Sequence, residues 1–172
     1  MRARTRIKER GSAVYPTKND LSKDVRNAVI DILDARLADA VDLQTQMKQA
    51  HWNVKGPTFI ALHELFDKVN EDVEDYVDDL AERVVQLGGV AHGTARQASA
   101  RSTLPEYPAV RDGHQHVEAV STVLAAFGKS VRTAIDRADG LGDKDTADLF
   151  TEISRGVDKW LWFIEAHLHA ER

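Results

Sequence analysis

The stretch from Gln49 to Arg83 reads QAHWNVKGPTFIALHELFDKVNEDVEDYVDDLAER, and its pattern decides the fold. A Gly56-Pro57 pair divides it, and in residues 58–87 the apolar positions recur at spacings of three and four. Glycine next to proline interrupts a helix, whereas three-and-four spacing is typical of an amphipathic helix. We therefore predict that one long helix ends before this pair and that a second spans residues 58–87.

The same spacing continues through the rest of the chain. Ser22 is a suitable N-cap for the first helix, and Gly88-Gly89 follows the second. The predicted helices span about residues 22–52, 58–87, 112–138 and 143–169. A long connection with Pro105 and Pro108 separates the second from the third, and within it residues 94–102 are compatible with a short helix. No segment alternates as a strand would. We predict an all-α, ferritin-like four-helix bundle with a long crossover between helices 2 and 3.

Composition narrows the class of protein. The chain has 172 residues, of which 42% are hydrophobic and 30% charged, and it has no cysteine. It therefore has neither disulfides nor a thiolate metal site, and a reducing cytoplasm is the simplest compartment. The longest apolar runs fall far short of the roughly 20 residues that cross a bilayer. No apolar segment follows the basic N-terminus, which argues against a secretory signal.

Charge is distributed unevenly along the chain. On this basis we divide the chain into a predicted flexible arm, residues 1–20, and the predicted bundle, residues 21–172. The first ten residues carry +4 and the whole chain −5, so the remainder carries −9. The basic residues among these first ten are Arg2, Arg4, Arg6, Lys8 and Arg10. Such an arm favours an anionic partner, and DNA binding through it would be phosphate-directed and independent of sequence. A solubilising tail or a disordered terminus remain alternatives, and a mitochondrial transit peptide fits less well.

The second predicted helix carries acids along one face. Residues 63–83 hold nine acidic side chains against Lys68 and Arg83. On this face His63/Asp67 and Asp78/Glu82 are each four residues apart, so each pair can converge on one metal ion. Asp67 and Asp78 are about 16.5 Å apart along a helix axis at 1.5 Å per residue, too far for both pairs to bind the same ion. One copy of this helix therefore cannot close a site alone.

Two copies packed antiparallel about a two-fold axis near Asp72 and Val73 would bring the two pairs together. His51, at the end of the first helix, could reach the same place. Imidazoles and carboxylates without sulfur suit Fe(II), and open coordination positions favour oxidation chemistry. The alternative is simpler: an acidic stripe is commonly a solvated face, and His63 alone is more often a surface histidine than a ligand.

The segment HWNVKGPxFxxLHxLFD, followed by D-x-x-x-E and Arg83, resembles the Dps family of miniferritins, the DNA-binding proteins from starved cells. The resemblance implies a hollow shell of twelve subunits with a ferroxidase centre between two-fold-related chains. It assigns His51, His63 and Asp67 to one subunit and Asp78 and Glu82 to its partner. It also implies that Fe(II) is oxidised preferentially by hydrogen peroxide, that ferric mineral is stored, and that DNA is thereby protected.

The resemblance suggests roles for other side chains. Trp52, beside His51, would accept stray oxidising equivalents or simply pack at a helix end. Trp160 and Trp162 are expected in the core or an interface. The acids expected to line the cavity are Glu64, Glu71, Glu74 and Asp75. The acids expected to line a pore are Asp143, Asp145 and Asp148. The helix dipole also favours acids at the start of a helix, which is an alternative explanation for the pore candidates. The pairs His114/His116 and His167/His169 diverge on a helix; they could bind a surface metal but form no convincing site.

Two classes of function are compatible with the sequence. The first is a cytoplasmic, nucleoid-associated ferroxidase and iron store that takes Fe(II) and peroxide as substrates and binds DNA through its arm. The second is an architectural DNA-binding protein of the nucleoid, in which the metal site is vestigial or binds an ion other than iron. Peroxide-driven iron oxidation distinguishes them.

Overall fold

A computed structural model describes residues 15–169, and in this part of the chain every regular element is helical. The helices are α1 (Lys23–Asn53), α2 (Phe59–Gln86), α3 (Ala95–Arg101), α4 (Gly113–Gly140) and α5 (Lys144–Glu165). The predicted all-α bundle, with a short helix in its crossover, is confirmed. The last helix ends four residues before the predicted position 169, because the N–H groups of His167 and Leu168 bond three residues back, in turns. None of the described helices is long and apolar enough to span a bilayer.

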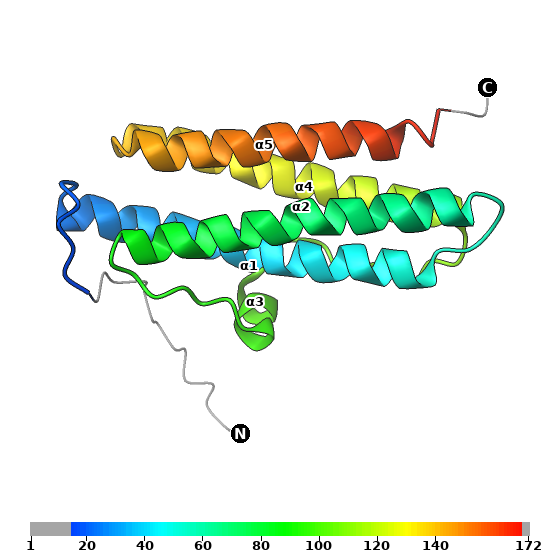
Figure 1. Ribbon diagram of the computed structural model, residues 1–172, viewed down its shortest axis with the longest axis horizontal. Helices are drawn as coiled ribbons and strands as arrows, with labels where there is room; N and C mark the ends of the chain where they lie inside the picture. Colours follow the sequence, from blue (N-terminus) through cyan, green and yellow to red (C-terminus); the bar gives the residue numbers. More distant parts are fainter. Residues whose placement is uncertain (1–14, 170–172) are drawn as a thin grey trace, which may run out of the picture.

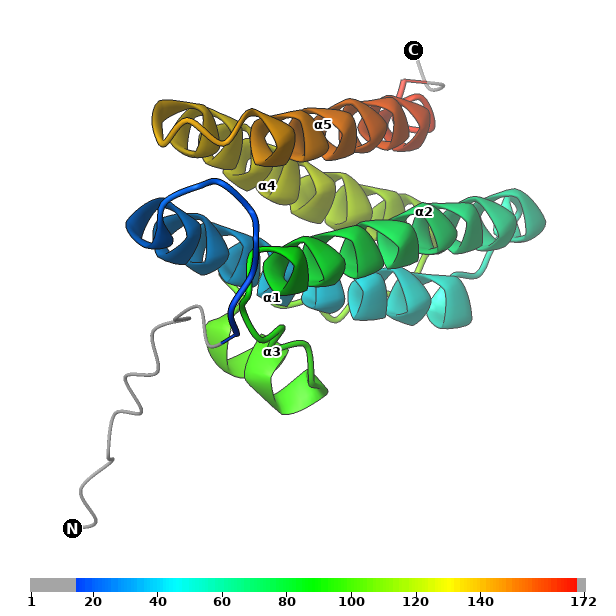
Figure 2. The ribbon, with the colours of Figure 1, turned by 60° about the vertical axis from the view of Figure 1, so that its left-hand side comes forward.

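The four long helices form two antiparallel pairs, α1 with α2 and α4 with α5, and α1 also packs on α4 (Figure 1). Helices α2 and α4 run in the same direction, so the connection between them returns along the length of the bundle. The turned view shows α3 on the outer side of α1, away from α5 (Figure 2). This long return is the feature that distinguishes the ferritin-like topology from an up-down bundle with short loops.

The core lies between the apolar faces of these helices. Its largest fully buried side chains include Phe66, Phe127 and Phe150, one from each of α2, α4 and α5. Trp160 is buried as expected, and its indole N–H donates to the Asp72 carboxylate at 2.7 Å. Trp162 is not in the core of its own chain, because 67% of it is exposed, and its place in an interface stays a prediction.

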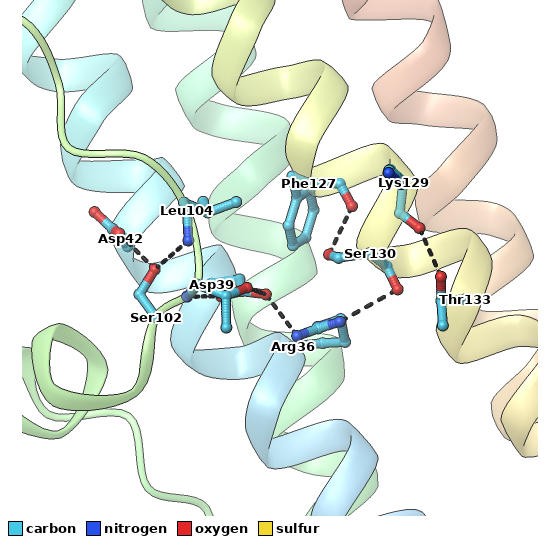
Figure 3. Close-up of polar contacts among 10 residues, drawn as sticks. Arg36, Asp39, Asp42, Ser102, Leu104, Phe127, Lys129, Ser130 and Thr133 are labelled. Atoms are coloured by element: carbon cyan, nitrogen blue, oxygen red, sulfur yellow. Dashed lines mark hydrogen bonds and ion pairs between the residues drawn. The ribbon is translucent and has the colours of Figure 1, made fainter.

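Buried carboxylates on α1 hold the crossover in place. Asp39 is fully buried, pairs with Arg36 at 2.8 Å and accepts the backbone N–H of Thr103 at 2.7 Å. The Arg36 guanidinium continues to the Ser130 carbonyl of α4 at 3.2 Å (Figure 3). A buried charge is tolerated only when it is paired and hydrogen-bonded, and the Asp39 carboxylate meets that condition. The crossover is thereby tied to both α1 and α4.

The segment before α1 packs against the far end of α2. The Tyr15 N–H donates to the Gly88 carbonyl at 3.1 Å. Gly88 has φ +86°, and a Cβ there would lie 2.6 Å from the Tyr15 carbonyl oxygen, so both conformation and space require glycine. Ser22 caps α1 as predicted, accepting the Val25 N–H. The five basic residues of the first ten lie outside the described residues.

Candidate metal centre

The end of α1 and the first turns of α2 lie side by side, joined by the turn at Gly56, and there His51 and His63 face each other. The Nδ1 of His51 lies 2.8 Å from the His63 carbonyl oxygen, and the Nδ1 of His63 lies 2.9 Å from the His51 carbonyl oxygen. The two rings stack with their centroids 3.7 Å apart and their planes 22° apart. Each histidine therefore fixes the orientation of the other.

This reciprocal bonding sets the tautomer of both rings. A carbonyl oxygen only accepts, so each Nδ1 must carry the hydrogen. In a neutral imidazole the remaining nitrogen, Nε2, then keeps its lone pair, and among the described residues it makes no hydrogen bond. Backbone carbonyls commonly orient metal-binding histidines in this way. The two rings are thus held in fixed orientations with their Nε2 atoms free, as a metal ligand would require.

Asp67 stands one helical turn after His63, near the two histidines. Its Oδ1 lies 2.6 Å from the Lys48 ammonium and 3.8 Å from the His51 Nδ1, and its side chain is 40% exposed. The hydrogen bond from Lys48 is the main cause that lowers the pKa of Asp67 below its usual value; partial burial opposes it, and the charges of His51, Lys48 and His63 reinforce it. Asp67 is therefore a carboxylate at neutral pH, available to a cation.

Lys48 is a member of this group that the sequence reasoning missed. It precedes His51 by three residues on α1, and residues three apart share a helix face. That spacing was the available signal, but nothing in the sequence shows that α1 turns this face toward Asp67. The ammonium occupies the carboxylate that an incoming cation would bind.

The other two candidate ligands, Asp78 and Glu82, lie farther along α2. Both are exposed, and about 16.5 Å of helix axis separates Asp78 from Asp67 at 1.5 Å per residue. Within residues 15–169 of a single chain, no three His, Asp or Glu side chains are grouped so that they could hold a metal ion. The five candidate ligands therefore lie in two separate groups, one at each half of α2.

Trp52 lies beside the first group at the edge of a groove. This groove of about 620 Å³ runs between α1, α2 and the crossover, and its lining includes Lys48, Trp52, Asn70 and Tyr107. Trp52 is 66% exposed, so it is not part of the core of its own chain. Its indole thus borders the groove that adjoins the candidate ligands.

The structure corrects the expectations for Asp143 and His116. Asp143 is only 2% exposed; it caps α5 through the Thr146 N–H and bonds Arg83 at 2.9 Å, so its carboxylate is used within the chain and is not free to line a pore. His116 is not a surface residue, because it is 1% exposed and its Nδ1 lies 2.6 Å from the Tyr107 hydroxyl. Asp143 is therefore a helix cap, and His116 is a core residue.

The other side chains predicted to line the cavity or a pore, and the other paired histidines, face solvent. Exposed residues among them are Asp145, Asp148, Glu64, Glu71, Glu74, Asp75, His114, His167 and His169. Their exposure is compatible with the predicted cavity and pore surfaces, which stay predictions. They also fit a simple solvated surface.

Comparisons with known proteins give a consistent result. The model of the ferritin-like domain family matches residues 30–172. The chain is 45% identical over 155 residues to the DNA protection during starvation protein of Agrobacterium fabrum, covering 90% of this chain and 96% of that protein. It is 34% identical to the protein of that name from Mycolicibacterium smegmatis, covering 87% and 82%. The solved structure of DpsA14 from Streptomyces coelicolor superposes with a TM-score of 0.88 at 33% identity, covering 95% and 96%.

Proposed function

Because the chain belongs to the ferritin-like family, and within it to the Dps proteins, we propose that it is a ferroxidase that oxidises Fe(II), preferentially with hydrogen peroxide. The observation that supports this most is the stacked pair of His51 and His63, whose Nδ1 atoms are held by backbone carbonyls and whose Nε2 atoms stay free, with the Asp67 carboxylate 3.8 Å from the His51 Nδ1. Neutral imidazoles and a carboxylate suit Fe(II) as a substrate. The ferric product would be stored as mineral inside a shell of twelve chains.

The centre would be completed by a second chain. A two-fold axis near the middle of α2 would place Asp78 and Glu82 of one copy opposite His51, His63 and Asp67 of the other. Isologous packing of this kind produces two equivalent centres per dimer. The added carboxylates would neutralise the ion and favour the harder ferric state, while the imidazoles leave positions open for the oxidant. Trp52, at the edge of the groove, would take up stray oxidising equivalents.

Non-specific DNA binding is the second part of the proposal. It rests on the five basic residues of the first ten and on the relatives, which are named for DNA protection during starvation. A body of net negative charge repels DNA, so the arm would supply the attraction. Twelve arms on one shell would bind with avidity, and the protein would be associated with the nucleoid of the cytoplasm.

Iron oxidation is tested by adding hydrogen peroxide to anaerobic, Fe(II)-loaded protein and following ferric absorbance. We expect the wild type to exceed a protein-free control, and the variants His63→Ala and Asp78→Ala to lose the acceleration. Equal rates for the wild type and a His63→Ala/Asp78→Ala chain would overturn the ferroxidase proposal and favour the architectural DNA-binding alternative. Circular dichroism checks that each variant is folded.

The sharing of the centre between chains is tested by mixing the two single variants. A dimer of one His63→Ala chain and one Asp78→Ala chain has one centre with both changes and one with neither. Random co-assembly, through unfolding and refolding together, would restore about a quarter of the centres. Co-assembled protein should therefore oxidise iron at about a quarter of the wild-type rate. No recovery after verified co-assembly would show that the ligands act within one chain.

A further inference from the structure

Tyr107 of the crossover and His116 of α4 form a pair beside the candidate metal centre. The Tyr107 hydroxyl lies 2.6 Å from the His116 Nδ1, and the imidazole is buried, with 1% exposed. Among the described residues the His116 Nε2 makes no hydrogen bond of good geometry, and the nearby Asn53 backbone is the polar group that acts on the ring. This is a short bond between a phenol and a buried base, and neither the fold nor the proposed iron centre requires it.

Both members of the pair are neutral at physiological pH. Burial lowers the pKa of His116, and the smaller effects of the Asn53 backbone and Asp112 oppose this shift. Burial also raises the pKa of the Tyr107 phenol above its usual value. The phenol therefore keeps its proton, and in the tautomer that carries the imidazole hydrogen on Nε2 it donates to the lone pair of the His116 Nδ1. A proton in this position can move to Nδ1 when the phenol loses an electron.

The pair lies close to the ligands without touching them. Tyr107 lines the same groove as Lys48 and Trp52. Lys48 bonds the Asp67 carboxylate at 2.6 Å, and Trp52 follows His51 in the chain. His116 lies against the Asn53 backbone, at the same end of α1. Tyr107 therefore shares a groove with the neighbours of the candidate ligands, yet is not a candidate ligand.

We propose that Tyr107 is a redox-active tyrosine that gives one electron to the oxidising iron centre while its phenolic proton passes to the His116 Nδ1. The inference rests on the proposed ferroxidase function and adds a second electron source to it. Hydrogen peroxide takes two electrons, whereas a single Fe(II) gives one. A centre that holds one iron ion would otherwise release a hydroxyl radical.

The step balances with peroxide as the oxidant. Fe(II) loses one electron and becomes Fe(III), and Tyr107 loses one electron and becomes a neutral phenoxyl radical. The two electrons break the O–O bond of hydrogen peroxide and yield two hydroxide ions. The phenolic proton goes to His116, which becomes an imidazolium. Charge and atoms are conserved, and the oxidising equivalent remains on a tyrosine in place of a diffusing hydroxyl radical.

The test is freeze-quench electron paramagnetic resonance of the assembled protein, loaded anaerobically with limiting Fe(II) and mixed with hydrogen peroxide. The chain has three tyrosines, so Tyr15→Phe and Tyr76→Phe are matched controls for Tyr107→Phe. We expect a tyrosyl radical in the wild type and in both controls, and its loss in Tyr107→Phe. In ¹⁵N-histidine-labelled wild type, double-resonance spectra should show a proton shared between the phenoxyl oxygen and an imidazole nitrogen. This measurement serves even if Tyr107→Phe does not fold.

Ferric absorbance is recorded on the same samples to separate the two proposals. If iron oxidation is accelerated but no radical forms, or if the radical persists in Tyr107→Phe, the redox role of Tyr107 is wrong and the ferroxidase function stands. A radical without coupling to an imidazole overturns the role of His116 as proton acceptor. If the wild type does not accelerate iron oxidation, the ferroxidase function fails and this inference fails with it.

Discussion

Lys48 determines the charge around the candidate ligands in the absence of metal. Its ammonium lies 2.6 Å from the Asp67 carboxylate and is the main cause of that group's lowered pKa. An incoming cation must displace this ammonium before it can bind the same oxygen. The ion pair is partly exposed, so its net contribution to stability is at most about 1 kcal/mol. We therefore predict that its larger effect is on metal binding.

We expect Lys48→Met to bind divalent metal about two- to fivefold more tightly, because an energy of this size no longer opposes the ion. The pKa of Asp67 would rise toward 3.8, which leaves it ionised at pH 7. Calorimetric titration with Zn(II), which is inert to oxidation, measures the affinity. Lys68→Met is the control, since Lys68 is exposed and makes no ion pair among the described residues. Weaker binding in Lys48→Met would mean that Lys48 orients Asp67 instead of competing for it.

Among the helices, the contact of α2 with α5 allows little change in side-chain volume. Gly156 of α5 faces Tyr76 of α2, and a Cβ at Gly156 would lie 2.0 Å from the Tyr76 hydroxyl oxygen. Tyr76 is buried, and burial together with the charges of Asp72, Glu152 and Asp75 raises its pKa to about 12. The phenol therefore remains neutral and stays against α5. Glycine at position 156 gives these helices their close approach.

Gly156→Ala should lower the free energy of unfolding by about 1–3 kcal/mol, the usual cost of overpacking a core. Urea denaturation at one fixed protein concentration measures it. Gly140→Ala is the control, because a Cβ there meets nothing within 4 Å, and it should be neutral or up to about 1 kcal/mol more stable. Adding Tyr76→Phe to Gly156→Ala removes the clashing oxygen and should restore part of the loss. Equal losses with and without that oxygen would contradict this explanation.

Across the whole molecule, charge and apolar surface are segregated. The first ten residues carry +4 against −9 on the rest of the chain. At one end of the bundle, α2 exposes Ile60 at 60%, and α5 exposes Trp162 at 67% and Phe163 at 36%. Large exposed apolar side chains commonly mark an interface. The family is oligomeric, and we predict that this surface is covered in the assembled shell.

Deleting residues 2–10 should abolish retardation of DNA at low salt and leave iron oxidation unchanged. The reason is that phosphate contacts come from the five basic side chains of this segment. Gel retardation over a range of salt concentrations measures the effect. A variant with these five residues replaced by glutamine keeps the length and controls for it. Retardation that survives the deletion would remove the arm from the DNA-binding proposal.

Light scattering of the wild type should give a mass near that of twelve chains. Trp162→Glu should lower this mass, because a buried charge would oppose contact at the apolar surface. Arg155→Glu, at an exposed position on the same helix, is the control and should assemble normally. A full-size assembly of Trp162→Glu would place this surface outside the interfaces. A monomeric wild type would overturn the shell.

The sequence by itself determined the helices, the long crossover with its short helix, and the spacing of the pairs His63/Asp67 and Asp78/Glu82 on α2. These follow from spacing along one helix, and helical spacing is a local property that a linear pattern records. Tertiary structure alone decided the exchange of bonds between His51 and His63, the approach of Lys48 to Asp67, and the burial of His116 and Asp143. Each of these joins residues on different elements, and their meeting depends on how whole helices pack, which periodicity does not encode.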